Sequence, residues 1–413
     1  MTAMSCWSIV PLLPKLFKPQ KGTINNMKKT LLLLFALIVA SGCIGSTVKS
    51  SNDAIVINEF SADPKIAQPP NDLVYFFIDI ENVGGTTARC VTADLYGAES
   101  WYNQAGQPLT YPSALTNGGL GFDYNNGRLS FSYWDPTKGF LNVGYDRQQG
   151  MSLSTYVDNS WNQFTNNFCG SASSWSQFDR IKYFDSINPA VPSQNKPGQS
   201  FTTQWILQPP VLPEGVHTTY PVTARVSYLY TTNAQINLQA FNKAEAQRRE
   251  ALGQSLTFPI TVETSYASPM QIAVTRGINP IIVNQRQPNF ELVNYLIEFQ
   301  NIGNGWPLPL DSDVDTPNGF IFATVELNGP GASFYDCLGA HSGTEVFVSG
   351  NMIQNLVKLR SDKRAPFGCT IAIDRASWAD TPIGTISLTF NLKYRYYTDA
   401  QTSVDVLGLQ ENV

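Results

Sequence analysis

Charge is scarce in this 413-residue chain, because Asp, Glu, Lys and Arg together make up 14% of it, against about 25% in an ordinary soluble domain. The 27 basic groups are outnumbered by 32 acidic ones, so the chain lacks the basic surface that phosphate neutralisation requires. We therefore expect no nucleic-acid partner. Histidine is rarer still: His217 and His341 are the only two, which leaves few components for metal sites or acid–base catalysis.

Sequence signatures of enzymes are also missing. The chain has no Gly-x-Ser-x-Gly elbow, no His-Glu-x-x-His, no Walker loop and no Gly-x-Gly-x-x-Gly between a strand and a helix, and each absence removes a large class of enzymes. We expect a protein that is not an enzyme. A glycosidase needs only two carboxylates at the right separation in space, so a secreted hydrolase stays as an alternative.

The N-terminal region carries an export signal. A positive segment, Met27–Lys29, precedes the wholly apolar run 31–40, and small residues follow at once, which is the order of a secretory signal peptide. The apolar run is much shorter than the ~20 residues that a helix needs to cross a bilayer. Residues 1–26 have no place in such a signal, so we expect translation to start at Met27.

The end of the signal resembles the lipobox of prokaryotic lipoproteins, with Ser41 and Gly42 directly before Cys43. The resemblance implies cleavage before Cys43 and lipidation of its thiol, hence an anchor in the membrane and a place on its outer face or at the cell surface. Residues 1–42 are then an upstream extension with the signal peptide. The small polar residues of 43–53 predict a flexible tether.

Two segments of the chain recur. Residues 73–84 can be laid on 292–303, both apolar and aromatic and both ending in Asn-x-Gly, and residues 228–235 match 394–401 with the spacing kept. Such recurrence predicts a tandem duplication. We place domain 1 at 54–265 and domain 2 at 267–408.

The pattern within each copy is that of strands. Alternate residues from Ile386 to Tyr396 are apolar, and Asn-Gly pairs punctuate such runs, as at Asn126-Gly127, where a hairpin is predicted. One short helix is predicted over 242–252, with Asn242 as its N-cap. The fold class is all-β: two tandem Ig-like antiparallel β-sandwiches, the first with a large insertion, joined via a short helix. The pattern resembles the Ig-like and CARDB-type modules of archaeal and bacterial envelope proteins, and implies a prokaryotic, by this likeness archaeal, envelope lipoprotein.

Cysteine usage agrees with export. Without Cys6 and Cys43 an even number remains, which in an exported chain predicts two disulfides. Four cysteines allow three pairings, and the duplication favours one pair in each domain. Buried free thiols are the alternative, whereas zinc is disfavoured because no Cys-x-x-Cys is present. The favoured pairs are Cys90 with Cys169 and Cys337 with Cys369.

Domain 1 is longer than its copy. From Asn82 to Tyr228 is 146 residues and from Asn301 to Tyr394 is 93, a difference of about 53 that we place within residues 91–180. Aromatic residues among abundant Asn, Gly, Ser and Gln suit stacking on sugars or contacts with proteins. The alternative is an extended core in which these rings are buried. The candidate binding residues are Trp101, Tyr133, Trp134, Trp161 and Trp175.

One acidic run is a candidate cation site. Asp311, Asp313 and Asp315 alternate as carboxylates do at the start of a calcium loop. An EF-hand is excluded, since Thr316 replaces the required Gly and Phe322 the bidentate Glu. A looser Ca²⁺ site is one reading, and a solvated acidic loop without any cofactor is the other.

Together these observations predict a non-catalytic lipoprotein of the cell envelope that acts outside the cell as an interaction or structural module, in adhesion or surface assembly. Its expected partners are the membrane, through the lipid anchor, and surface proteins or glycans, with self-association as a further mode. The alternatives are a carbohydrate- or solute-binding lipoprotein that uses the aromatic insertion, and a secreted hydrolase.

Overall fold

The computed structural model describes residues 52–109, 120–125, 128–135, 139–146, 150–155, 169, 179–194, 196–265, 267–284, 289–308, 319–338, 347–349 and 351–408. Within these ranges antiparallel strands dominate, and α3 (Lys243–Ala251) is the one α-helix of several turns. The fold is an all-β sandwich fold, as the sequence predicts.

The first sandwich has a small sheet of its own. In it β3 (Val74–Asn82) lies between β1 (Ile55–Asp63) and β10 (Ser200–Leu207) and runs antiparallel to both. Alternate residues of β3, among them Phe76 and Ile78, are fully buried, while their neighbours are more exposed. Since successive side chains of a strand point to opposite faces, this sheet covers a core with one side only.

The second sandwich also has its own sheet, of four strands in the order β13 (Met270–Arg276), β15 (Phe290–Asn301), β21 (Arg364–Asp374) and β18 (Ala332–Cys337). All three pairings are antiparallel. Cys337 and Cys369 lie directly opposite each other in the pairing of β18 with β21, and a disulfide joins them.

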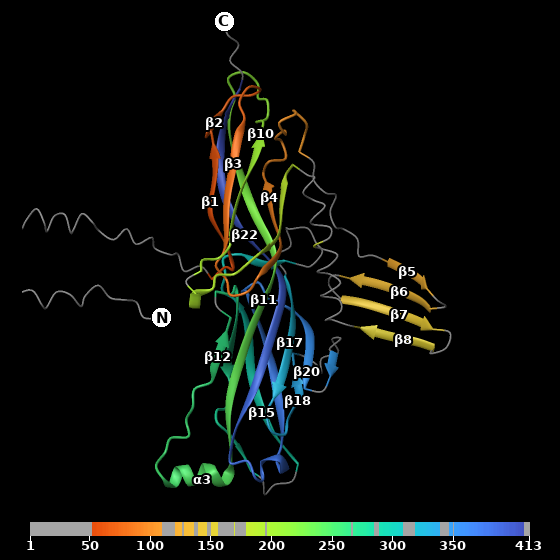
Figure 1. The fold of residues 1–413 in the computed structure, drawn as a ribbon, viewed down its shortest axis with the longest axis vertical. Helices are drawn as coiled ribbons and strands as arrows, with labels where there is room; N and C mark the ends of the chain where they lie inside the picture. Colours follow the sequence, from red (N-terminus) through yellow and green to blue (C-terminus); the bar gives the residue numbers. More distant parts are fainter. Residues whose placement is uncertain are drawn as a thin grey trace, which may run out of the picture. The chain divides into compact units, whose positions relative to one another are not determined.

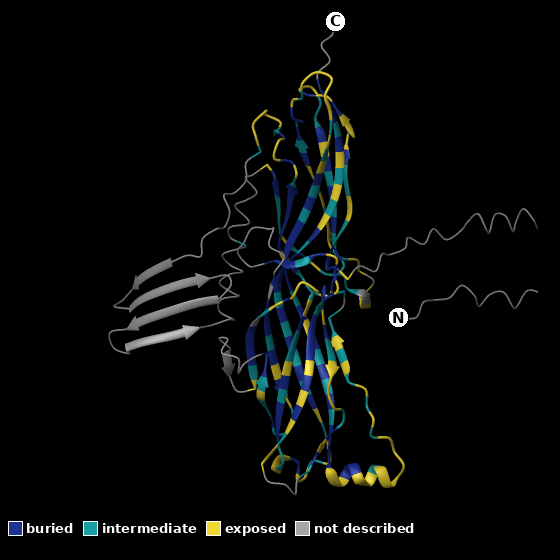
Figure 2. Ribbon diagram, turned by 180° about the vertical axis from the view of Figure 1, so that it is seen from behind, coloured by how far each residue is buried: buried dark blue, intermediate teal, exposed yellow. Residues whose placement is uncertain are grey.

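A single large sheet forms the other layer of both sandwiches. Two long strands, β11 (His217–Asn242) and β22 (Ile383–Leu407), pair along almost their whole length and run through both sandwiches (Figure 1). Buried and more exposed residues alternate along them (Figure 2). Beside β11 lie β4 (Ala88–Tyr96) and then β9 (Ile181–Ile187); beside β22 lie β17 (Phe320–Asn328), β20 (Met352–Lys358) and β19 (Phe347–Ser349); and β2 (Ile66–Ala67), β12 (Thr261–Thr264), β14 (Ile281–Val283) and β16 (Trp306–Leu308) pair with one long strand or the other.

Each of the two long strands contributes one half to each sandwich. The first half of β11 pairs with β4, and its second half pairs with β12 and β14. The first half of β22 pairs with β17, and its second half lies against the first half of β11. In sequence β11 lies before the expected division at 265–267 and β22 after it, yet each strand contributes to both sandwiches. Neither β11 nor β22 is broken by a turn at its middle. Each strand therefore runs on beyond the sandwich that is formed by its own copy of the duplicated sequence.

The duplicated segments meet where the long strands cross. Tyr228, Tyr230, Tyr394 and Tyr396 are all buried there, and the Tyr396 hydroxyl donates to Asn301 Oδ1 at 2.9 Å. Asn82 and Asn301 each accept a hydrogen bond from the glycine two residues later, at 3.0 and 3.1 Å. The Asn-x-Gly repeats are thus equivalent turns, each adjoining a tyrosine of the Tyr-x-Tyr repeats.

The helix follows the sequence prediction closely. Asn242 Oδ1 accepts from the Glu245 backbone amide at 2.9 Å, which caps the helix. The Glu245 carboxylate accepts from Arg249 one turn on, at 2.8 Å. Gly253, with a φ of +69°, follows the end of the helix, because a left-handed residue there costs glycine little.

Candidate interaction surface

The long insertion is fastened to the sheet at a β-bulge. Leu229 pairs with Arg89 and Ser227 with Thr92, so two residues of β4, one of them Cys90, oppose one residue of β11. Cys90 has a φ of 53° and forms the disulfide with Cys169. The pairing is the one that the sequence favoured. Cys90 is buried at this bulge.

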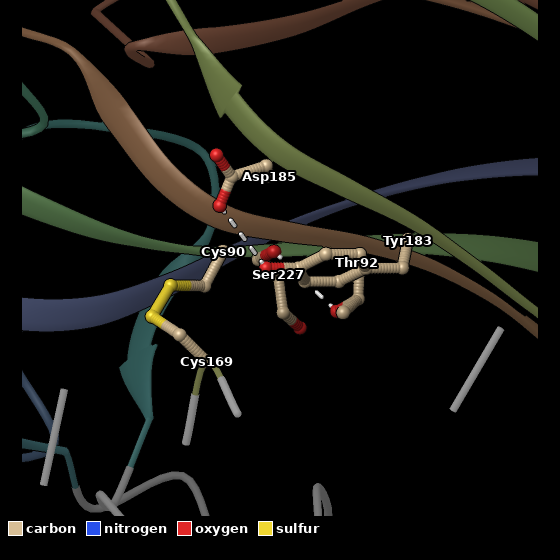
Figure 3. The surroundings of a disulfide bond; sticks show 6 residues. All are labelled: Cys90, Thr92, Cys169, Tyr183, Asp185 and Ser227. Atoms are coloured by element: carbon tan, nitrogen blue, oxygen red, sulfur yellow. Dashed lines mark hydrogen bonds between the residues drawn. A yellow bond between two sulfur atoms is a disulfide. The ribbon is translucent and has the colours of Figure 1, made fainter. Parts of the chain in front are cut away.

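Polar side chains surround this attachment point (Figure 3). The Thr92 hydroxyl donates to the Ser227 carbonyl at 3.5 Å, and the Tyr183 hydroxyl donates to Asp185 at 3.3 Å. Thr92 and Ser227 are nevertheless buried. The non-core face of the large sheet is therefore polar in character and covered at this position.

A ladder of arginine and tyrosine side chains continues along the same face. The Arg225 guanidinium lies between two rings, 4.0 Å from the centroid of Tyr397 and 4.9 Å from that of Tyr96. The Arg180 guanidinium lies 4.7 Å from the Tyr96 ring. Contacts of this kind are worth about 0.5 to 2 kcal/mol each, the larger figure applying where the cation is desolvated. The ladder thereby holds β22, β11, β4 and the chain entering β9 together.

Each arginine of this ladder has an acidic partner. Arg225 donates from Nε and from its second terminal nitrogen to the two carboxylate oxygens of Asp399, both at 2.7 Å. Arg180 Nε donates to Asp94 at 2.8 Å, and the Arg180 carbonyl accepts from the Trp205 indole at 2.9 Å. The two pairs are thus planar and directional, which fixes the rotamers of both arginines.

The electrostatics of the two pairs differ. Asp94 is 8% exposed, and burial raises the pKa of its carboxyl from 3.8 to about 6, outweighing the opposite effect of Arg180 beside it. Its charge therefore changes in mildly acidic solution. The Asp94–Arg180 pair is thus the part of the ladder whose charge depends on pH in this range.

The insertion contributes a four-stranded sheet in the order β5 (Leu120–Asn125), β6 (Arg128–Asp135), β7 (Gly139–Asp146) and β8 (Gly150–Thr155). All its pairings are antiparallel, and β5 with β6 is the hairpin predicted at Asn126-Gly127. Directly paired residues share a face, so the register divides the residues into two sets. One set is apolar and aromatic; the other is rich in Ser, Gly, Asn and Asp.

The candidate binding residues fall in different places. Tyr133 and Trp134 are neighbours on β6, hence on opposite faces of the insertion sheet. Trp161 and Trp175 lie outside the described residues. Trp101 is a correction: it is fully buried and packs edge-on against Phe76 at 5.2 Å, so it belongs to the core of the first sandwich and offers no face to a sugar.

The predicted anchor and cation residues, Cys43, Asp311, Asp313 and Asp315, lie outside the described residues. Within the part of the chain that the structure does describe, His, Cys, Asp and Glu side chains form no group that could hold a metal ion. In that same part, no helix combines the length and the apolar character needed to cross a membrane.

Sequence reasoning missed the ladder. Arg225 lies opposite Asp94 on β4 and Asp399 on β22, but these residues are far apart in the chain, and their meeting depends on the register of strands. The available signal was the charged position within the otherwise uncharged run 218–242 of β11. A charge in such a strand indicates a place where the sheet has a polar face.

No family model matches the chain, and no curated protein matches it. Among solved structures it is similar to an envelope protein, VP37, of White Spot Syndrome Virus, with 12% identity over 40% of this chain and 98% of that one and a TM-score of 0.15. It is also similar to a type II cohesin dyad from the adaptor ScaA scaffoldin of Acetivibrio cellulolyticus, with 10% identity over 82% of this chain and 84% of that one and a TM-score of 0.12. Neither likeness carries an argument about the function of this chain.

Proposed function

We propose that the chain is a non-catalytic lipoprotein of the prokaryotic cell envelope, anchored on the outer face of the membrane through lipidated Cys43. The two sandwiches act outside the cell as an interaction or structural module in adhesion or surface assembly. The observation that carries this proposal is the pair of disulfides, Cys90–Cys169 and Cys337–Cys369, because such bonds form and persist in oxidising compartments outside the cytoplasm.

The contact element of the module is the insertion. Its strands β5–β8 form a sheet separate from those of the two sandwiches, and the disulfide at Cys90 fastens the insertion to the large sheet. Loops and insertions on a rigid scaffold are where binding residues concentrate. The paired charges of the ladder are Arg180 with Asp94 and Arg225 with Asp399. They support a scaffolding role for the face of the large sheet on which the ladder lies.

Cross-linking mass spectrometry on intact cells that express the full chain tests the proposal. We expect a mature N-terminus at lipidated Cys43 and cross-links to surface proteins or to other copies of the chain. The matched variant is Cys43→Ser, which should leave the folded part intact and lose membrane attachment. A wild-type protein without the lipid, or one cross-linked to cytoplasmic proteins alone, would contradict the proposal, as would turnover of a polysaccharide or peptide by the purified protein.

A second candidate function is glycan binding by the polar face of the insertion sheet. Trp134 pairs with Phe140 on that face, and its neighbours there include Ser132 and Asn142. Aromatic rings among amide and hydroxyl groups suit stacking and hydrogen bonding to sugars. Binding on a glycan array that Trp134→Ala abolishes and Tyr133→Ala, on the opposite face, retains would establish it.

A further inference from the structure

The chain enters the fold close to the middle of the two long strands. Asp53 accepts from the Tyr396 hydroxyl at 3.4 Å and from the Asn304 backbone amide at 2.9 Å. Tyr396 pairs with Tyr228, which lies 11 residues from one end of β11 and 14 from the other. The tether that leads back to Cys43 therefore joins the fold far from both ends of the long strands.

The tether is short compared with these strands. Residues 44–51 separate Cys43 from the first described residue, and an extended chain spans at most about 3.6 Å per residue, so a lipid on Cys43 lies within roughly 30 Å of this entry point. The nearer end of β11 is about 36 Å from Tyr228 at ~3.3 Å per residue. An anchored chain is thus held too close to stand on either end of its long strands, and one of its sides faces the bilayer.

The entry point shows which side this is. The even-numbered residues of β11 are buried from Val222 in the first sandwich to Ala240 in the second, so one face of the large sheet carries both cores. On that side lie the first small sheet (β1, β3 and β10) and the second small sheet (β13, β15, β21 and β18). Asp53 precedes β1, and Asn304 follows β15. The tether therefore leaves on the side of the small sheets, and the Arg225 ladder lies on the other side.

The outer face of the second small sheet carries an exposed apolar stripe along β15. Phe290, Leu292 and Leu296 are 55%, 51% and 41% exposed, and they alternate with less exposed residues. On β21, Ala372 pairs with Leu292 and Gly368 pairs with Leu296, so the small neighbours leave both leucines standing above the sheet. Covering such a stripe with an apolar phase is favourable, because it removes apolar area from water.

The corresponding face of the first small sheet is acidic. It carries four carboxylates, and β1, β3 and β10 contain no basic residue. Contact with lipid would strip water from these charges at a cost in free energy. The first small sheet is therefore a poor surface to lay against a bilayer. The four carboxylates belong to Glu59, Asp63, Asp79 and Glu81.

Charge on the second small sheet is closer to balance. Arg276 pairs with Leu296, and Arg364 with Gln300, so two cations accompany the stripe. Arg364 also lies 3.6 Å from the Glu298 carboxylate. Three carboxylates share this face, those of Glu298, Asp336 and Asp374. Of the two small sheets, the second thus has both the apolar stripe and the smaller excess of negative charge.

We propose that the outer face of the second small sheet rests on the membrane that holds the lipid anchor, with Phe290, Leu292 and Leu296 in the headgroup region. Interfacial binding of this kind grows with the apolar area that is buried in the headgroup layer. The inference rests on the proposed function, since it needs the lipid at Cys43, and it adds which side faces the bilayer. The face with the Arg225 ladder is then turned away from the membrane.

Oxidative footprinting on vesicles tests the inference. The chain from Cys43 onward, with its disulfides formed, is coupled through the Cys43 thiol to a maleimide lipid in vesicles of phosphatidylcholine and phosphatidylglycerol. The reference is the same chain in solution with this thiol capped. Hydroxyl radicals label exposed side chains, and mass spectrometry locates the label. We expect labelling of Phe290, Leu292 and Leu296 to fall several-fold on vesicles, whereas Ile66, 58% exposed at the end of the first sandwich, keeps its label.

A double variant tests whether the apolar stripe makes the contact. Leu292→Glu with Leu296→Glu should restore the labelling of Phe290 on vesicles, because two charged side chains disfavour contact with lipid. Both positions are exposed, so the fold tolerates the change. The matched control is Thr202→Glu with Gln204→Glu, at exposed positions of β10 on the outer face of the first small sheet, which should leave Phe290 as protected as in the wild type.

Three results would overturn the inference: equal labelling of the stripe on vesicles and in solution, loss of label at Ile66 in its place, or protection that appears in solution as the concentration rises, since a second copy would then be the cover. Each of them leaves the proposed function standing, because the lipid at Cys43 is read separately, from the N-terminus of the protein isolated from cells. A protein that lacks this lipid in cells would overturn both.

Discussion

Leu229 of β11 lies directly opposite Arg395 of β22, and the two are also counterparts in the duplicated sequence. The repeat relates Tyr228 to Tyr394, an offset of 394 − 228 = 166, and 229 + 166 = 395. A residue paired with its own counterpart marks the axis of a pseudo-two-fold. The two sandwiches are therefore related by rotation about this pair, and each completes its large sheet with half a strand from the other.

Shared strands predict that the two sandwiches unfold together. Ile78→Ala on β3 and Ile371→Ala on β21 each truncate a fully buried side chain in one sandwich alone, and each should cost about 2 to 5 kcal/mol. Because β11 and β22 belong to both cores, either substitution should lower one common midpoint in urea, followed by fluorescence. Hydrogen exchange should show the same loss of protection in both sandwiches. Two separate transitions would refute the coupling.

The Asp94 carboxyl predicts a pH dependence of stability. Its pKa is raised from 3.8 to about 6 in the folded protein, so between these values the folded state binds more protons than the unfolded state. The contribution of this group to the free energy of unfolding is therefore largest below about pH 4 and declines by about 3 kcal/mol as pH rises through 6. Asp94→Asn should remove this slope in denaturation curves measured from pH 4 to 7.

The control for this experiment is Asp399→Asn, which removes the other carboxylate of the ladder. It should weaken the hold on Arg225 while keeping the slope that belongs to Asp94. The prediction fails if Asp94→Asn and the wild-type protein show the same pH dependence.

The two disulfides predict a loss of stability on removal. They close loops with sequence separations of 79 and 32 residues, for which the chain-entropy model gives about 4 kcal/mol each. Replacing both members of either pair with serine should lower the urea midpoint accordingly. Removing Cys90–Cys169 should in addition make the insertion more sensitive to limited proteolysis, whereas removing Cys337–Cys369 should not. Equal cleavage of the insertion in both variants would contradict its attachment through Cys169.

The hydrogen bonds between Asp53 and Asn304 predict that Asp53, near the start of the described residues, stabilises the fold. Asp53 is buried and accepts from the Asn304 backbone amide and side-chain amide, each at 2.9 Å. Asp53→Ala should leave these donors unsatisfied and cost about 1 to 3 kcal/mol, measured by thermal unfolding. Asn52→Ala, one residue earlier and exposed, is the control and should change stability little. An unchanged melting temperature for Asp53→Ala would show that the contacts do not stabilise the fold.

Local sequence signals predicted local structure well. Asn242, Glu245 and Gly253 define the short helix, Asn126-Gly127 the hairpin, and the Asn-x-Gly repeats the paired turns. These features depend on neighbouring residues or on spacing along the chain, and both can be read directly.

Features that depend on distant pairing could not be predicted in this way. The exchange of β11 and β22 rests on a register between residues 383–407 and 217–241, and alternation alone does not reveal a partner. Trp101 falls within the range assigned to the insertion but belongs to the core, since aromatic composition says nothing about which rings are buried. The Arg225 ladder likewise appears only when three strands are aligned.

The crossing of the long strands also sets an order of assembly. Residues 394–407 complete the first sandwich, although almost all of its other strands are synthesised before residue 230. Until that last strand arrives, the edge of β11 stays unpaired, and an unpaired edge can recruit another chain. A ribosome or translocon that stalled between residues 265 and 383 would release a chain with an open first sandwich, prone to aggregation and proteolysis.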